Sequence, residues 1–241
     1  TSHVLVVNPN TSPEVTESYL SVARSIAPTV TFTGVTGRFG ARIVSTEAEN
    51  IIAGHAALDL VAEHLPGPDA VILAISFDTG LSALRELLSI PVIGITEAAL
   101  RAAESYDQRL GVVSFGEVSR PLYQALFKSY GTDPVGWHTI DIGSTADYLS
   151  VQAKEAAVVA ACERLEAAGA GAVILCGAVV AGMAARLREH VKCGIFDGAE
   201  AIPACLAALE DRQSPIRSMS PVSDSIGLSL GMSALLRGNR R

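Results

Sequence analysis

The chain has 241 residues, of which 49% are hydrophobic and 18% are charged, a composition typical of a globular protein that buries a sizeable core. Its 18 basic and 25 acidic residues give a formal net charge of −7, and the basic residues are scattered. This argues against a nucleic-acid partner and against a membrane surface, because both require a basic footprint. No apolar run reaches the ~20 residues of a membrane span, and residues 1–7 lack the pattern of a secretory signal. We therefore expect a cytoplasmic protein.

The first half of the chain alternates short β-branched runs with segments of helical periodicity, the pattern of a parallel α/β sheet. We expect strands at 3–7, 29–35, 70–76 and 91–95, with helices from Pro13 onward, over about 46–65 and 81–88, and from Thr96 to about 105. Ser12 before Pro13 favours this first helix start, because serine is a preferred N-cap and proline fits the first turn.

The second half repeats the same alternation. We expect strands at 109–115, 137–143, 172–178 and 193–199, each followed by a helix: about 117–130, about 147–168, to about 190 and to about 210. The motif AVIL at 70–73 recurs at 172–175, an offset of 102 residues, and the first strands fit a slightly larger offset, with Val6-Val7 against Val112-Val113.

This long repeat predicts an α/β fold of two similar lobes, each a parallel sheet flanked by helices, with an active-site cleft between them. We place the first lobe at residues 1–105 with the tail 212–241 packed back on it, and the second lobe at 106–211. The alternative is that any two α/β segments resemble each other to this degree.

Ligands of open parallel sheets bind beyond the carboxyl ends of the strands, where turns expose backbone N–H groups. The residues in those turns are our candidates for the cleft: Asn8, Asn10 to Ser12, Ser76 to Thr79, Thr96, Glu97, Ser114, Cys176 to Ala178, Asp197 and Gly198. Asn10 could present its amide to a carbonyl or imide, or it could be part of an ordinary Asx turn. Asp78, Thr79, Glu97 and Asp197 could equally cap helices.

Four cysteines are present, without CxxC pairs and without metal-ligand spacing. Cys176 differs from the others because it ends a strand where a helix is expected to begin, and a helix N-terminus lowers the pKa of a thiol. Its alternative role is that of a small buried hydrophobic residue. Cys162 and Cys205 fall on apolar helix faces and are expected in the core, and Cys193 is expected to be inert. Neither a metal site nor a nucleotide-phosphate motif is present, so we expect no cofactor.

The turns and strands together resemble the aspartate/glutamate/hydantoin racemase superfamily, and within it the hydantoin and allantoin racemases. The resemblance covers almost the whole chain and rests on HVLVVNPNTS (3–12), DAVILAISFDTGL (69–81), IPVIGITEAA (90–99), GAGAVILCGAVVAGMA (169–184) and GIFDGAEAI (194–202). It implies a two-lobed enzyme that needs neither pyridoxal phosphate nor metal. It further implies that two cysteines, one per lobe, flank the stereocentre, one removing the proton and the other returning it. These positions map to Cys176 and Ser76.

Ser76 departs from that pattern, because an alcohol ionises far above the ~8.5 of a thiol. Three explanations remain open: a cysteine-to-serine variant made to trap a ligand, which we favour; a natural one-thiol member similar to the arylmalonate decarboxylases; or a homologue with another reaction or none. The repeat offset of 102 also places Ala178, not Cys176, opposite Ser76.

The resulting hypothesis is racemisation at C5 of a 5-substituted hydantoin or a related cyclic ureide such as allantoin. Asn10 and the backbone N–H groups after Ser76 and Cys176 would stabilise the enolate, and the other substrate-binding candidates are Phe77, Asp78, Thr79, Ser114, Gly177 and Ala178. The alternatives are a one-cysteine decarboxylase of disubstituted malonates and a non-catalytic small-molecule binding protein. Helix faces rich in Ala and Leu lead us to expect a homo-oligomer.

Overall fold

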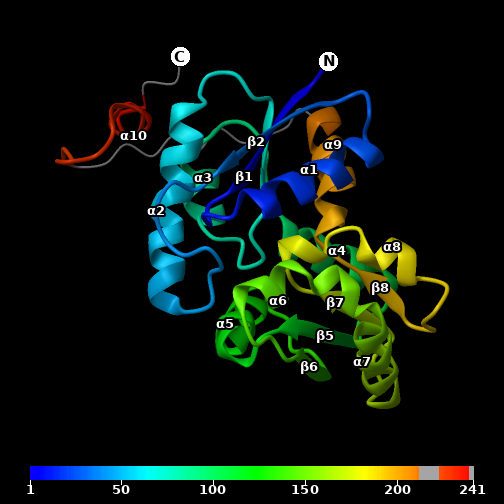
Figure 1. Ribbon diagram of the computed structural model, residues 1–241. Helices are drawn as coiled ribbons and strands as arrows, with labels where there is room; N and C mark the ends of the chain where they lie inside the picture. Colours follow the sequence, from blue (N-terminus) through cyan, green and yellow to red (C-terminus); the bar gives the residue numbers. More distant parts are fainter. Residues whose placement is uncertain (212–222, 239–241) are drawn as a thin grey trace.

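The computed structural model describes residues 1–211 and 223–238, which form two four-stranded parallel sheets flanked by helices (Figure 1). The first sheet has the order β2-β1-β3-β4, with β1 at His3–Asn8, β2 at Thr31–Thr36, β3 at Ala70–Leu73 and β4 at Val92–Gly94. The second has the order β6-β5-β7-β8, with β5 at Leu110–Phe115, β6 at Gly136–Ile140, β7 at Ala172–Leu175 and β8 at Gly194–Phe196. The predicted α/β fold class is confirmed.

The sequence repeat is also a structural repeat. β1 pairs with β3 so that Val7 lies opposite Leu73, and β5 pairs with β7 so that Val113 lies opposite Leu175. The offset of 102 residues therefore holds between β3 and β7, and the larger offset predicted for the first strands holds between β1 and β5. Apart from half-buried His3, these four strands consist of buried, mainly aliphatic residues, as expected for the centre of a parallel sheet covered on both faces.

Most helices lie close to their predicted positions, but two differ. The helices are α1 (Pro13–Ile26), α2 (Glu47–Glu63), α3 (Leu81–Leu87), α4 (Ile95–Tyr106), α5 (Arg120–Ser129), α6 (Thr145–Leu149), α7 (Glu155–Ala167), α8 (Met183–Leu187), α9 (Ala201–Asp211) and α10 (Leu230–Leu236). The helix expected between residue 178 and about 190 covers only Met183–Leu187 and follows a 3-10 turn. The single helix predicted over about 147–168 was wrong, because α6 ends before Ser150 and α7 follows only after a short 3-10 turn. The Ser150 hydroxyl donates back to the carbonyl oxygens of Ala146 and Asp147, and such side-chain bonds compete with helix continuation.

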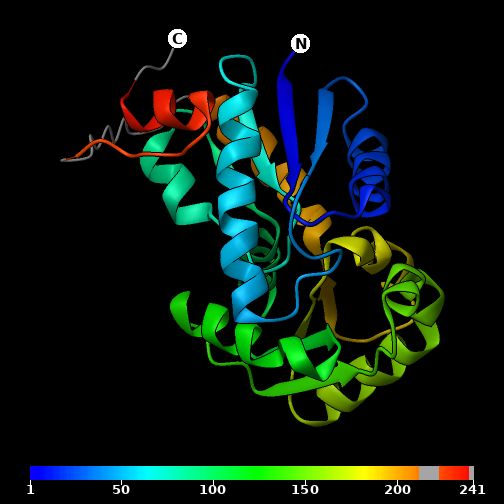
Figure 2. The same ribbon diagram turned by 60° about the vertical axis from the view of Figure 1, so that its left-hand side comes forward.

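Two helices cross from one sheet to the other. α4 follows β4 of the first sheet but packs on β7 and β8 of the second, and α9 follows β8 but packs on β3 and β4. Figure 2 shows α9, in orange, beside the first sheet. The division of the chain at 105/106 and 211/212 stays a prediction, and these exchanged helices tie the two sheets together.

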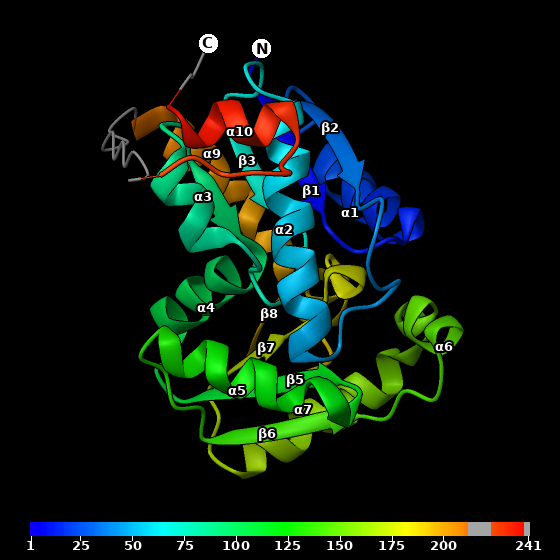
Figure 3. The ribbon, with the colours of Figure 1, turned by 90° about the vertical axis from the view of Figure 1, so that its left-hand side faces the viewer.

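The described part of the C-terminal tail lies on the first lobe. α10 packs against α2 (Figure 3). The Ser229 hydroxyl donates to the Asp59 carboxylate at 2.6 Å. The rest of the predicted tail, residues 212–222 and 239–241, falls outside the described residues. No helix within the described ranges is long and apolar enough to cross a membrane.

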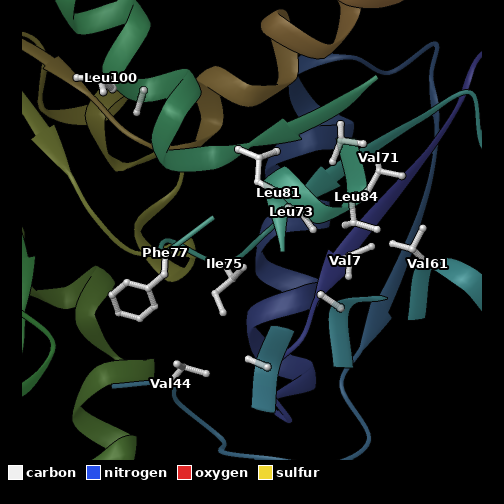
Figure 4. Packing of buried hydrophobic residues seen from close by; sticks show 14 of the residues in the cluster. Val7, Val44, Val61, Val71, Leu73, Ile75, Phe77, Leu81, Leu84 and Leu100 are labelled. Atoms are coloured by element: carbon white, nitrogen blue, oxygen red, sulfur yellow. The ribbon is translucent and has the colours of Figure 1, made fainter. Parts of the chain in front are cut away.

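In the first lobe, α2 and α3 pack on the sheet through aliphatic side chains. Figure 4 shows Val7, Leu73 and Leu84 within this core and Val44, Ile75 and Phe77 at the edge nearest the second lobe. That edge is where the residues beyond β3 meet the other half of the molecule.

Candidate functional site

A cavity of about 380 Å³ lies between the two lobes at the carboxyl ends of their strands. From the first half it is lined by Asn10, Ile43, Val44, Ser45, Glu49, Ala74, Ile75, Ser76 and Phe77. From the second half it is lined by Phe115, Gly116, Val118, Ser119, Tyr123, Ile142, Gly143, Ser144, Thr145, Tyr148 and Ala178. The geometry thus brings together four of the predicted site residues: Asn10, Ser76, Phe77 and Ala178.

Ser76 lies in the turn beyond β3, where the other lobe reaches it. Its side-chain oxygen is 2.5 Å from the Tyr123 hydroxyl, and its carbonyl oxygen accepts a 2.5 Å hydrogen bond from the Thr96 hydroxyl. The rings of Phe77 and Tyr123 pack with their centroids 4.6 Å apart. Ser76 is therefore held between a helix of its own lobe and a tyrosine of the other.

The Asn8-Pro9-Asn10 turn is built around a side-chain network. Asn8 Nδ2 donates to Asn10 Oδ1 at 2.8 Å, and that oxygen also accepts from the backbone N–H of Ser12 at 2.9 Å. Asn10 Nδ2 makes no hydrogen bond to another described residue, so this amide can donate to a ligand in the cavity. Ser12 does not cap α1 with its side chain, because its hydroxyl instead donates to the Arg42 carbonyl oxygen.

Asp78 and Thr79 have local structural partners and do not line this cavity. The Asp78 carboxylate accepts from the backbone N–H groups of Thr96 and Glu97, in the first turn of α4, and from the Tyr130 hydroxyl. The Thr79 hydroxyl donates to the side-chain oxygen of Asn50 in α2. Ser114 is likewise away from the cavity, buried with its hydroxyl 3.3 Å from that of Thr139.

The surroundings of Cys176 differ from those predicted from the sequence. Cys176 is 1% exposed and does not line the cavity. Burial, with a contribution from the charge of Asp78, raises the pKa of its thiol, so the predicted lowering was wrong in direction. The helix expected to lower this pKa does not follow directly after the thiol, because residues 178–180 form only a 3-10 turn and α8 begins at Met183. All four cysteines are buried and free, which confirms the core positions predicted for Cys162 and Cys205.

The residue of the second half that is equivalent to Ser76 by the repeat offset is Ala178. Both side chains line the cavity, and each lies three residues beyond its strand, β3 or β7. Gly177, between Cys176 and Ala178, has a φ of +133°, a region that favours glycine.

Several cavity residues were missed by the sequence reasoning, above all Tyr123 in α5 and Tyr148 in α6. They lie within helices, whereas the prediction considered only the turns after strands, and no pattern in the sequence separates them from ordinary helix residues. Glu49, also missed, accepts hydrogen bonds from Ser45 and Thr46 at its Oε2 in the capping box of α2, so one of its carboxylate oxygens is already engaged.

No group of three or more metal-ligating side chains is found among the described residues. The polar lining of the cavity consists of hydroxyls, the Asn10 amide and the Glu49 carboxylate. Such a lining can hold carbonyl and N–H groups of a small molecule by hydrogen bonds.

Comparisons with known proteins place the chain among racemases. The sequence profile of Asp/Glu/Hydantoin racemase matches residues 4–205. A hydantoin racemase from Paenarthrobacter aurescens is 28% identical over 211 residues, which cover 85% of this chain and 89% of that protein. The structure of allantoin racemase from Klebsiella pneumoniae has a TM-score of 0.86 at 27% identity and covers 98% of this chain and 99% of that one. Allantoin racemase from Pseudomonas fluorescens has a TM-score of 0.83 at 26% identity, over 93% and 100% of the two chains. The chain belongs to the Asp/Glu/Hydantoin racemase family, as its sequence motifs predicted.

Proposed function

We propose that this protein is a cofactor-independent racemase of a 5-substituted hydantoin or a related cyclic ureide such as allantoin. The observation that carries the proposal is the cavity between the lobes, to which Ser76 of one strand-end turn and Ala178 of the other both contribute. Relatives of similar length are named for hydantoin and allantoin racemisation, and the hydroxyl and amide lining suits the carbonyl and N–H groups of a ureide ring.

The proposed reaction replaces the proton on C5 by another proton on the opposite face. A base removes the proton from C5, the electron pair of the C–H bond moves toward the neighbouring carbonyl oxygen, and an acid on the opposite face returns a proton to C5. We propose that Asn10, which lines the cavity and whose Oδ1 is already hydrogen-bonded to Asn8, donates through Nδ2 to that oxygen as charge develops on it. We assign the two faces to position 76 and to Cys176, where the superfamily pattern has its cysteines.

Ser76 is the weaker acid and base of this pair, and we propose that it replaces a cysteine at this position. A serine hydroxyl at this position is a poor base, and a positioned acid or base contributes typically ~10²–10⁴-fold to a rate. The chain with Ser76 should therefore racemise its substrate slowly. Cys176 directly follows β7 and lies two residues before Ala178, which lines the cavity.

The test compares four proteins: the chain itself, Ser76→Cys, Cys176→Ala and the double variant. Racemisation of an enantiopure 5-substituted hydantoin and of allantoin is followed by polarimetry, with buffer alone as the baseline. We expect Ser76→Cys to raise the rate by roughly 10²-fold or more, and this gain to be lost when Cys176 is replaced by Ala. A gain that persists without Cys176 would remove Cys176 from the mechanism while leaving the racemase proposal intact.

Exchange of the C5 proton in deuterium oxide gives a second readout. Because Cys176 is the only thiol of the assigned catalytic pair, the unmodified chain should exchange one enantiomer faster than the other, and equal exchange of both would contradict the assigned roles. If none of the four proteins acts on a cyclic ureide, carbon dioxide release from a disubstituted malonate tests the decarboxylase alternative. Ligand binding without turnover would identify a binding protein.

A further inference from the structure

Tyr148 is a cavity residue whose hydroxyl has no hydrogen-bond partner among the residues that the structure describes. It lies in α6 and lines the cavity with its side chain partly buried. Its hydroxyl oxygen would be 3.4 Å from a Cβ built on Gly177, so it lies over the turn that follows β7. Within residues 1–211 and 223–238, no side chain or backbone group makes a hydrogen bond with it. Buried phenol hydroxyls usually find a partner, and a ligand in the cavity could supply one here.

The protonation state of Tyr148 decides what it can offer. Burial, together with the nearby charge of Cys176, raises the pKa of its phenol above the ordinary value of 10.0. The hydroxyl therefore keeps its proton at neutral pH. It can donate a hydrogen bond and cannot serve as the base that removes a proton.

Tyr123 provides the contrast. It also lines the cavity with a raised pKa, but its hydroxyl is 2.5 Å from Ser76 Oγ. Tyr123 thus lies at the turn after β3 with its hydroxyl engaged, and Tyr148 lies at the turn after β7 with its hydroxyl free. Among the described residues the Tyr148 hydroxyl therefore remains available to an uncharged acceptor in the cavity, as does Asn10 Nδ2.

We propose that Tyr148 is a substrate-contacting residue whose hydroxyl donates to the carbonyl oxygen next to the reacting carbon of a cyclic ureide. This inference rests on the proposed function and names the ring carbonyl that the site recognises. The hydrogen bond strengthens as negative charge moves from C5 onto this oxygen, so it favours the enolate over the bound substrate. Tyr148 would then assist whichever group takes the proton.

The experiment compares Tyr148→Phe with Tyr106→Phe. The control makes the same chemical change at a 63% exposed tyrosine that packs on Phe196 away from the cavity. Two probes are titrated by calorimetry: hydantoin, which has carbonyls at C2 and C4, and 2-imidazolidinone, which lacks the C4 carbonyl. Folding of each variant is checked by circular dichroism and by its melting temperature.

We expect Tyr148→Phe to weaken hydantoin binding about 10-fold, the loss of one net hydrogen bond, with 2-imidazolidinone binding changed less than about twofold. In the Ser76→Cys background the same substitution should lower kcat by roughly 10²-fold and change KM less, because the donor acts most strongly on the enolate. Tyr106→Phe should change none of these values.

The outcomes separate this inference from the proposed function. Equal losses for both probes, or no loss for either, would overturn the role of Tyr148, whether or not the protein is a racemase. Hydantoin binding that depends on Tyr148 without turnover in any variant would support the recognition role and contradict racemisation. A wild-type chain that binds neither probe would overturn both.

Discussion

Asp78 supports the surroundings of the cavity without lining it. It has a φ of +49°, unusual for a residue with a side chain, and is 4% exposed. Asp78 lies two residues after Ser76 in the chain. Its carboxylate accepts hydrogen bonds from the first turn of α4 and from the Tyr130 hydroxyl of the second lobe. Burial raises the pKa of Asp78 to about 7, although the hydrogen bonds from Tyr130, Thr96 and Glu97 act in the opposite direction.

This raised pKa predicts a pH dependence of stability. The unfolded chain releases the Asp78 proton near 3.8 and the folded chain only near 7, so the contribution is complete below about pH 4 and is lost as the pH rises to 7. Asp78→Asn should remove it. From urea unfolding between pH 4 and 8, the free energy of unfolding of the wild type should fall by roughly 4 kcal/mol more than that of the variant, at about 1.36 kcal/mol per pH unit. Parallel pH profiles would contradict the shift.

At the scale of elements, the start of α4 depends on a glycine. A Cβ on Gly94 would lie 2.5 Å from the Asp78 carboxyl group, which its hydrogen bonds hold in place. Gly94→Ala should therefore destabilise the protein by about 1–3 kcal/mol, the range for overpacking. Gly54, inside α2, is the matched control: the nearest atom to its Cβ would be 3.7 Å away, so Gly54→Ala should stabilise by roughly 0.5–1 kcal/mol. Urea midpoints that move in the same direction for both would contradict this account.

The elements also show how far sequence reasoning extends. Each strand was predictable because its β-branched run ends at polar or glycine residues, and the repeat offset identified Ser76 and Ala178 as equivalent positions. The packing of α4 and α9 on the opposite sheets was not predictable, because the apolar face of a helix carries no information on which sheet it covers. The environment of Cys176 was missed for a related reason: whether a turn continues into an α-helix depends on a few backbone angles, and here a 3-10 turn intervenes.

At the scale of the whole molecule, the two lobes share their hydrophobic cores. One buried cluster contains Leu5 and Leu73 of the first sheet together with Leu110, Val112 and Ile174 of the second. The Tyr19 hydroxyl of α1 also donates to the Gly198 carbonyl oxygen across the boundary, at 2.9 Å. Since α4 and α9 each pack on the sheet of the other lobe, neither lobe has a complete core of its own. The cavity is therefore built on a single folding unit.

This predicts one cooperative unfolding transition, which the only tryptophan can test. Trp137 lies in β6 of the second sheet, so its fluorescence reports on that lobe, whereas circular dichroism reports on both. Leu5→Ala, in the fully buried centre of β1, should cost about 2–5 kcal/mol. Its urea midpoint should fall equally by fluorescence and by circular dichroism, because losing the first sheet removes the packing surface of α9 and opens the shared core. A Trp137 transition left at the wild-type midpoint would mean that the lobes unfold independently, and the cavity between them would then depend on two separate stabilities.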